Sequence, residues 1–303
     1  MSILRDNVNE GPSALRNILK DSFAVAPGVI DGIAALQAQR AGFNSLYLSG
    51  SGVAGSMGLP DLSVTTLTEV AECVRKIVQV SKLPLIVDAD TGFGEAINVT
   101  RTVRVLESVG ASAIHIEDQV LPKKCGHLSG KVLVDPREMI LKVKAAVEAR
   151  KNDDFVIIAR TDARSVTGLN DAIERAKEYT ENGADMIFTE ALESKEEFAK
   201  FAREIKTPLL ANMTEFGKSP LLTVDELRRI GYKAVIFPLT AFRASLLTNE
   251  AVFSFIAKNG TQAGIMDRLM TRTEFYTLIG YDDYENEDSN LASRNYKKDR
   301  SSK

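Results

Sequence analysis

Eight short apolar runs, separated by amphipathic stretches, constrain the fold of this chain more than any other feature. Each run is continuously apolar rather than alternating, as expected for parallel strands buried on both faces. Intervening segments such as Thr66–Val80 and Asn170–Asn182 carry apolar residues at helical spacing. The pattern predicts an α/β protein with a (β/α)₈ or TIM barrel, and an open doubly wound sheet is the alternative. The runs are Phe23–Val29, Ser45–Leu48, Leu83–Val87, Ala113–Ile116, Phe155–Ala159, Asp185–Phe188, Pro208–Ala211 and Ala234–Phe237.

The length of 303 residues exceeds the roughly 250 residues of such a barrel. We assign the barrel to residues 23–245, because no shift in composition interrupts the alternation of runs and helix-like stretches there. The surplus then lies at the ends, as an N-terminal helical segment (1–22) and a C-terminal helical extension (246–303). Helix-like patterns cover Ser13–Lys20, Leu246–Lys258 and Gly264–Ile279. We therefore expect a single barrel domain over residues 1–303.

Charge and composition exclude several classes of protein. The chain has 38 basic and 41 acidic residues, a net charge of −3, which gives no basic footprint for nucleic acid. No apolar run approaches the roughly 20 residues of a membrane span, and the first eleven residues do not resemble a signal peptide. Two cysteines make no disulfide framework, so we expect a cytoplasmic protein.

Polar residues follow seven of the eight runs. In a parallel barrel the carboxyl ends of the strands and the loops after them build the active site. Acids, arginines and glycines gathered at so many strand ends favour a functional site over ordinary polar loops. The segments are Ser49–Gly52, Asp88–Gly94, Glu117–Gln119, Arg160–Asp162, Thr189–Glu190, Asn212–Glu215 and, just beyond the eighth run, Arg243.

Three of these acids are candidate metal ligands. Asp88 and Asp90 lie two residues apart at a strand end, so their side chains point to the same side, and Glu117 ends the neighbouring strand. Hard oxygen ligands without a Cys/His pattern suit Mg²⁺ or Mn²⁺. The alternative is a helix-capping aspartate and a salt bridge in a loop.

Three arginines are candidates for binding substrate carboxylates, because the planar guanidinium matches a carboxylate in two parallel hydrogen bonds. Arg160 ends a buried run, where an unpaired cation would be costly, so an internal pair with Asp162 or Glu190 is its alternative. Arg243 follows the eighth run. Arg272 lies in a helix-like C-terminal stretch, where its position alone would place it on the surface.

The loop Leu121–Lys131 is the most unusual segment. Cys125 is flanked by Lys123, Lys124 and His127, cationic groups that we expect to depress the thiol pKa. Gly126 and Gly130 provide the flexibility of a lid. The second cysteine, Cys73, lies on an apolar helix face and is assigned to core packing, and His115 fits a core or a site role equally well.

Several motifs in order resemble the isocitrate lyase/phosphoenolpyruvate mutase superfamily, over about four fifths of the chain from Phe23 past Arg272. DADTGFG (88–94) indicates the superfamily, and KKCGH (123–127) its C–C lyase branch; YLSGSGVA, HIEDQ, ARTDA, FTEA, ANMTEFG and PLTAFRA follow the same order. Short length and Phe188 favour the 2-methylisocitrate lyases within that branch. The resemblance implies a barrel whose last helix is exchanged between the subunits of a homotetramer.

The resemblance also assigns roles to residues. It implies that Asp88 and Asp90 hold Mg²⁺, with Glu117 assisting through water, and that a small tricarboxylate is cleaved to pyruvate and succinate. Cys125 is then the acid and Tyr47 the base, with His127 in the catalytic set. Implied substrate contacts are Ser49, Gly50, Ser51, Cys125, Gly126, Arg160, Glu190, Asn212, Met213, Thr214, Arg243 and Arg272.

The chain departs from the family pattern at a few positions, and these keep other activities open. Ser51 replaces a frequent glycine, Lys124 a frequent arginine, and Leu128–Gly130 is nearer to the loop of isocitrate lyases. Isocitrate lyase, or a relative that acts on oxaloacetate or phosphonopyruvate, is therefore the alternative activity. A catalytically silent scaffold barrel is the alternative outside the enzymes.

Overall fold

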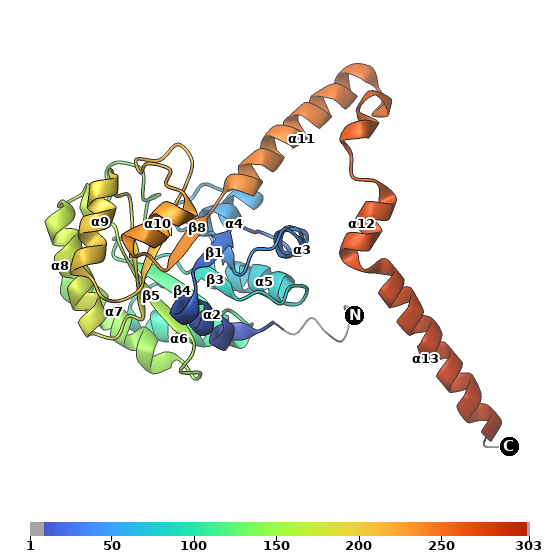
Figure 1. The fold of residues 1–303 in the computed structure, drawn as a ribbon, viewed down its shortest axis with the longest axis horizontal. Helices are drawn as coiled ribbons and strands as arrows, with labels where there is room; N and C mark the ends of the chain where they lie inside the picture. The colour runs from blue at the N-terminus through green and yellow to red at the C-terminus, as the bar shows by residue number, and fades with distance from the viewer. Residues whose placement is uncertain (1–8, 302–303) are drawn as a thin grey trace. The chain divides into compact units, whose positions relative to one another are not determined.

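The computed structural model describes residues 9–301 and contains a barrel of eight parallel strands (Figure 1). The strand order is β1-β8-β7-β6-β5-β4-β3-β2, and a parallel bridge between Gly28 and Tyr47 joins the two end strands. All eight predicted runs are strands, and the predicted (β/α)₈ barrel is confirmed over the open sheet. The strands are β1 Ala24–Pro27, β2 Leu46–Leu48, β3 Leu85–Asp88, β4 Ala113–Glu117, β5 Val156–Thr161, β6 Met186–Thr189, β7 Leu209–Asn212 and β8 Ala234–Phe237.

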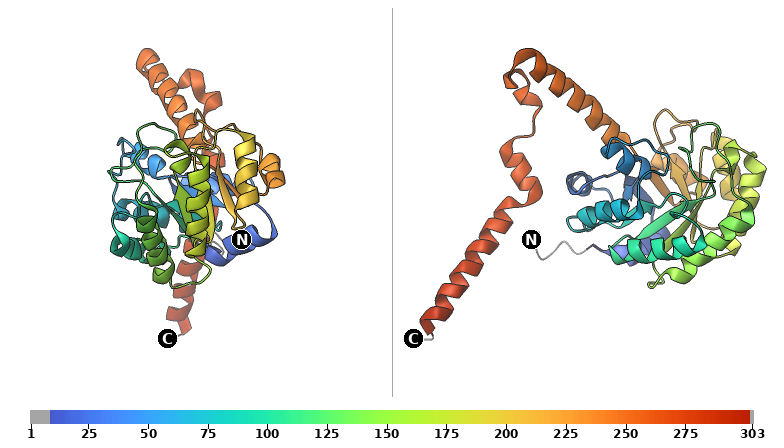
Figure 2. Two further views of the ribbon diagram at one scale, coloured as in Figure 1. Left: turned by 90° about the vertical axis from the view of Figure 1, so that its left-hand side faces the viewer. Right: turned by 180° about the vertical axis from the view of Figure 1, so that it is seen from behind.

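Helices surround the strands on the outside (Figures 1 and 2). The sequence patterns at Thr66–Val80 and Asn170–Asn182 correspond to α5 and α8, each within two residues of the expected ends. α5 begins at a capping box, in which Thr66 and Glu69 satisfy each other's backbone amides. The helices are α2 Gly11–Asp21, α3 Gly32–Arg40, α4 Gly50–Ser56, α5 Leu67–Val78, α6 Ala96–Ser108, α7 Pro136–Ala149, α8 Leu169–Glu181, α9 Lys195–Glu204 and α10 Val224–Ile230.

The apolar side chains form two clusters, which explains why the strand sequences are apolar without interruption. One cluster packs between the strands and the outer helices, with members such as Val87, Ile114 and Ile157. The other fills the inside of the barrel and includes Ile86, Ile158 and, from α2, Leu15 and Leu19. Successive strand residues face opposite sides and both sides are covered, so the strands are largely apolar, and buried polar residues such as Glu117 and Arg160 lie towards their carboxyl ends.

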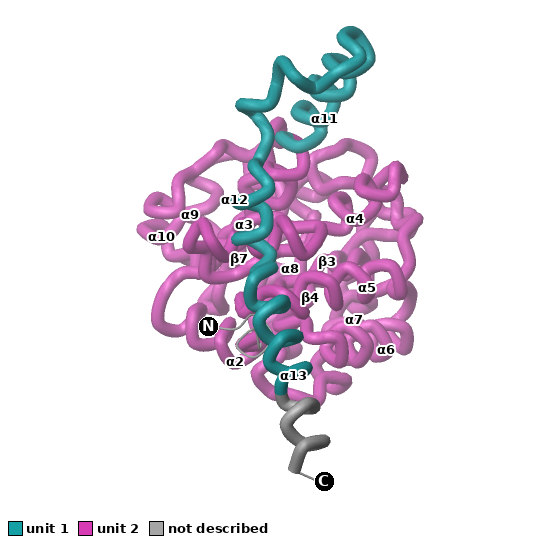
Figure 3. The backbone as a smooth tube through the Cα atoms, turned by 90° about the vertical axis from the view of Figure 1, so that its right-hand side faces the viewer, with its two compact units in different colours: residues 1–8, 244–303 teal, residues 9–243 magenta. Residues whose placement is uncertain are grey.

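The described chain divides into two compact units, residues 9–243 and residues 244–301 (Figure 3). The second unit contains most of α11 Thr240–Asn259, a 3₁₀ turn at Ala263–Arg268, α12 Arg272–Ile279 and α13 Tyr281–Ser301. The helix predicted over Gly264–Ile279 is therefore interrupted, because Thr271 caps a new helix with Glu274. The organisation as one domain stays a prediction, and residues 1–8 of the N-terminal segment lie outside the described residues. No helix within residues 9–301 is both long and apolar enough to cross a membrane.

Candidate active site

A small cavity of about 80 Å³ lies at the carboxyl ends of the strands, and it gathers most of the residues that the sequence singled out. Its lining comprises Tyr47, Ser49, Ser51, Asp61, Asp88, Lys123, Cys125, Gly126, His127, Arg160, Phe188, Glu190, Asn212, Thr214, Pro238, Leu239 and Arg243. Gly50 and Met213 adjoin residues of this lining, whereas Arg272 begins α12 in the other unit. Asp61 was missed, because it lies in the loop after α4 and not at a strand end.

The three candidate metal ligands meet beside this cavity. Asp88 accepts hydrogen bonds from the backbone N–H of Gly50 (2.9 Å) and of Asp90 (3.0 Å). A Cβ atom at position 50 would lie 3.1 Å from carboxylate oxygens of both aspartates, so the close approach of the chain requires glycine. Lys123 Nζ lies 3.0 Å from Asp90 Oδ1 and also pairs with Asp61.

Burial and neighbouring charges set the protonation of these acids. Burial would raise the pKa of Asp88, but His115 and Lys123 outweigh it and bring that pKa down to about 2. Burial raises the pKa of Asp90 to about 6, because Lys123 offsets it only in part. The pKa of the buried Glu117 also lies well above its usual range. The site therefore holds more buried negative charge than its cations stabilise.

The donor set suits a magnesium ion. Both carboxylate oxygens of Glu117 are buried and accept no hydrogen bond from the described residues. Within residues 9–301 no three His, Cys, Asp or Glu side chains converge closely enough to enclose a metal by themselves. Mg²⁺ is commonly bound by one or two carboxylates and keeps several waters, so Asp88 and Asp90, with Glu117 behind water, match its preference.

Arg160 is the central cation of the site. Its Nε and Nη2 donate to Asp162 at 2.9 and 3.1 Å, while Nη1 lies 3.3 Å from Glu117 and 3.6 Å from Glu190. The internal ion pair that the sequence offered as an alternative is thus present. Because only one edge of the guanidinium is used by Asp162, the other edge remains turned to the acids of the cavity, and substrate binding by Arg160 stays a prediction.

Arg243 also lines the cavity and lies against Glu215. Arg243 Nη1 donates to the carbonyl oxygen of Glu215 at 3.1 Å, and its guanidinium lies over the ring of Phe216, 5.5 Å from the ring centre. The side chain of Arg243 is 39% exposed, whereas Arg160 is buried.

The loop Leu121–Lys131 is packed closely against the strand ends. A Cβ atom at Gly126 would lie 2.5 Å from Arg160 Nη2 and 2.6 Å from Glu190 Cδ, so the role of this glycine is close approach. His127 Nε2 lies 2.7 Å from Glu190 Oε1, and its Nδ1 accepts the backbone N–H of Lys218 at 2.9 Å. The loop is therefore observed closed over the cavity.

A buried amine fastens this loop to the barrel. Lys131 Nζ donates to the carbonyl oxygen of Gly126 and, at 2.8 Å, to Asp162. Asp162 is the same carboxylate that holds Arg160. Asp162 therefore contributes both to the closure of the loop, through Lys131, and to the orientation of the Arg160 guanidinium.

The thiol of Cys125 corrects one expectation from the sequence. Burial raises its pKa, although the backbone N–H of His127 opposes this, so the expected depression is wrong. The flanking cations do not act on the sulfur, because Lys123 turns to Asp61 and Lys124 donates to the carbonyl of Gly130. At neutral pH the thiol is therefore protonated and able to act as an acid.

His115 belongs to the site rather than to an isolated core position. Its Nε2 lies 2.8 Å from Tyr47 Oη and 3.4 Å from Asp88 Oδ1, and Tyr47 Oη also donates to Asp88 at 3.4 Å. Burial lowers the pKa of His115 to about 4, so the ring is neutral at pH 7. Burial and the charge of Asp88 raise the pKa of Tyr47 well above its usual value.

Comparisons with known proteins agree with this geometry. Residues 15–257 match the family Phosphoenolpyruvate phosphomutase. A 2-methylisocitrate lyase of Aeropyrum pernix is 56% identical over 96% of this chain and 94% of its own. A crystal structure of 2,3-dimethylmalate lyase superposes with a TM-score of 0.87 at 36% identity, over 92% of this chain and 95% of that one. Phosphonopyruvate hydrolase, solved with oxalate and Mg²⁺, gives a TM-score of 0.83 at 31% identity, over 92% and 98%.

The fastening by Lys131 can be tested directly. Lys131→Met removes the cation and leaves Asp162 with Arg160 alone, so we expect the free energy of unfolding to fall by about 3 kcal/mol. Amide hydrogen exchange in peptides spanning the loop should also become faster. Lys124→Met, at a half-buried position of the same loop whose amine, among the described residues, reaches only Gly130 of that loop, is the control. Unchanged exchange in Lys131→Met would contradict the fastening role.

Proposed function

Because the chain belongs to the phosphoenolpyruvate phosphomutase family, we propose that it is a lyase that cleaves (2S,3R)-2-methylisocitrate to pyruvate and succinate. The proposal rests chiefly on the loop that carries Cys125, which lies closed over a cavity lined by Arg160. The Arg160 guanidinium lies close to three acids, which are Glu117, Asp162 and Glu190. Membership of the family indicates the class of reaction. The polar side chains that line the cavity offer hydrogen bonds and charges to a tricarboxylate. In the cell, this activity would serve propionate catabolism through the methylcitrate cycle.

The proposed substrate carries three carboxylates, and the cavity offers cations on several sides. Arg160 and Arg243 both line the cavity, together with the hydroxyl and amide groups of Ser49, Asn212 and Thr214. Phe188 and Leu239 add apolar surface for the methyl group. Ser51 adds a hydroxyl to this lining.

We assign the metal site to Asp88 and Asp90, with Glu117 contacting the ion through water. Mg²⁺, or Mn²⁺ in its place, would neutralise charge on the substrate oxygens as the bond breaks. Burial raises the pKa values of Asp90 and Glu117, so a bound cation would favour their charged forms. Gly50 leaves space for Asp88 and Asp90.

Bond cleavage needs a base and an acid. Loss of the proton from the tertiary hydroxyl lets the C2–C3 electrons move to the succinate fragment, whose carbon then takes a proton. Cys125 is the proposed acid, since its thiol is protonated and the closed loop excludes water. His127 also belongs to the proposed catalytic set, and its Nε2 lies 2.7 Å from Glu190 Oε1.

Tyr47 is the proposed base, and its hydrogen bonds define what this role requires. Burial and the charge of Asp88 oppose ionisation of the phenol, so Tyr47 can take the substrate proton only as it passes its own proton on. The neutral His115 is placed to receive that proton at Nε2, 2.8 Å from Tyr47 Oη, and the imidazolium formed would lie 3.4 Å from Asp88 Oδ1. The two rings also stack, with centres 5.8 Å apart, which fixes the direction of the hydroxyl.

We also propose that the protein is a cytoplasmic homotetramer in which the last helix is exchanged between subunits. α11 has no buried residue among its 20 positions, and Leu247 and Phe253 are 72% and 68% exposed. Exposed apolar surface of this kind marks interaction surfaces, and a second copy of the chain is the proposed partner. Both cysteines are free, as suits a reducing compartment. We include in this proposal that Arg272 contacts the substrate in the assembled tetramer.

The acid role of Cys125 predicts a large loss in Cys125→Ser. Pyruvate release from 2-methylisocitrate with Mg²⁺ should fall about 100-fold or more, because a hydroxyl is a far weaker acid than a thiol. Cys73→Ser, at the half-buried cysteine of α5, should retain near-normal turnover. A near-normal rate in the Cys125 variant would remove that residue from the mechanism. Glyoxylate formed from isocitrate faster than pyruvate from 2-methylisocitrate would overturn the substrate assignment.

The metal assignment predicts that chelation abolishes turnover and that Mg²⁺ or Mn²⁺ restores it. Asp88→Asn should weaken Mg²⁺ binding, measured by calorimetry without substrate, about tenfold or more, because a charged ligand is lost. The matched control is Asp153→Asn at an exposed loop position. Equal Mg²⁺ affinity in the two variants would place the metal elsewhere.

The assembly proposal predicts a mass of four chains by light scattering. Phe253→Glu should shift the protein to smaller species, because it places a charge within the apolar interface. Leu141→Glu is the control, since Leu141 is 59% exposed on the outer helix α7. A monomer in the unmodified protein, or a tetramer unaffected by Phe253→Glu, would contradict the proposal.

A further inference from the structure

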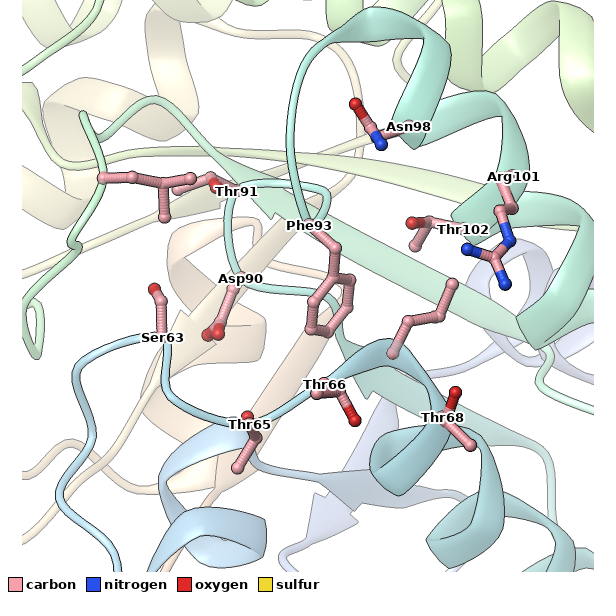
Figure 4. A pocket seen from close by; sticks show the side chains of 12 residues that line it. Ser63, Thr65, Thr66, Thr68, Asp90, Thr91, Phe93, Asn98, Arg101 and Thr102 are labelled. Carbon is pink, nitrogen blue, oxygen red and sulfur yellow. The ribbon is translucent and has the colours of Figure 1, made fainter.

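A second cavity, of about 370 Å³, lies beside the candidate metal site (Figure 4). It is formed by the segment before α5, the loop between β3 and α6, and the first turns of α6. Its lining is Ser63, Thr65, Thr66, Leu67, Thr68, Asp90, Thr91, Phe93, Asn98, Arg101, Thr102 and Leu121. No residue lines both this cavity and the catalytic one, and Asp90 is the only residue of its lining that the proposed reaction uses.

Charge is distributed unequally across this second cavity. Arg101 supplies a guanidinium that forms no ion pair or hydrogen bond with any described residue. The only acid of the lining is Asp90, whose carboxylate already lies 3.0 Å from Lys123 Nζ. Figure 4 shows the ring of Phe93 between Asp90 and Arg101. The end of the cavity at Arg101 therefore suits one anionic group, and the end at Asp90 disfavours a second.

Buried hydroxyls without partners give an independent indication of a ligand. Thr91 is fully buried, and its Oγ1 forms no hydrogen bond within residues 9–301. The Oγ atom of Ser63 is also buried and has no hydrogen-bond partner within residues 9–301, and both residues line the cavity. Buried hydroxyls normally find a partner, since leaving one unpaired costs free energy. By contrast, Thr102 Oγ1 is satisfied by the carbonyl of Gly92 at 3.0 Å.

The remaining lining is apolar. Phe93, Leu67 and Leu121 offer surface to a short hydrocarbon body. A volume near 370 Å³ is at the lower end of the usual range for small-molecule sites. The ligand must thus be small, partly apolar and singly charged.

We propose that this cavity binds a small monocarboxylate that carries a hydroxyl or oxo group. Its carboxylate pairs with Arg101, its carbon chain packs on Phe93 and Leu67, and its polar oxygen meets the unpaired hydroxyls of Thr91 and Ser63. Dicarboxylates bind less well, because the second charge would face Asp90. This site adjoins the proposed metal site at Asp90, but its binding of a monocarboxylate does not depend on the proposed reaction.

The test uses calorimetry of the full chain with lactate as the probe. Arg101→Gln should weaken lactate binding at this site about tenfold, since a charge-assisted pair is lost. Arg104→Gln, exposed on the same helix and outside the lining, should bind lactate as the unmodified protein does. Propane-1,2-diol, which lacks the carboxylate, should show no binding, and succinate should bind more weakly than lactate. Circular dichroism confirms that both variants fold.

A crystal soaked in lactate locates the ligand. Density beside Arg101 and Phe93 supports the proposal. Density confined to the catalytic cavity, or equal lactate affinity in Arg101→Gln and Arg104→Gln, overturns it. The proposal also fails if the side chains of a neighbouring subunit fill the cavity in the assembled protein. Loss of lyase activity in any preparation leaves these outcomes unaffected, so the two proposals fail separately.

Discussion

The ion pair between Arg160 and Asp162 is the contact on which the rest of the site depends. Both residues are buried at the end of β5, where neither charge could remain without the other. Asp162 also receives Lys131, which holds the loop at Gly126, and its backbone N–H donates to Asp118 at 2.8 Å. Asp118 in turn accepts hydrogen bonds from Thr161 and, on α8, Tyr179. One buried residue, Asp162, therefore links the barrel wall, Arg160 and the closed loop.

Burial and the charges nearby together set the pKa values of the buried acids and the thiol. Asp162, beside Arg160, and Asp88, near His115 and Lys123, have lowered pKa values because these neighbours outweigh burial. Burial prevails at the thiol of Cys125 and at the carboxyl of Glu117, whose pKa values are raised although Arg160 Nη1 lies 3.3 Å from Glu117. The same apolar surroundings thus supply both a neutral proton donor and fixed anions within one small cavity.

The sequence predicted the strands and most of the cavity lining because burial on both faces and polar strand ends are local patterns. It could not predict contacts that depend on the direction of a side chain. Lys123 and Lys124 are neighbours of Cys125 in sequence, but both amines turn away from the sulfur, so the expected pKa shift has the opposite sign. Asp61 lies in an irregular loop, where no periodicity marks it.

The backbone of the loop after β3 explains how two cavities can share one short segment. Asp90 and Phe93 have left-handed φ values of 48° and 58°, and Gly92 between them has φ of 93°. Aspartate tolerates this region, whereas a left-handed phenylalanine costs roughly 1 kcal/mol or more. The tight turns direct the Asp90 carboxylate to Lys123 and the Phe93 ring into the second cavity. Such strain persists only where the surroundings impose it, so the conformation that presents Asp90, the proposed metal ligand, also shapes the lining of the second cavity.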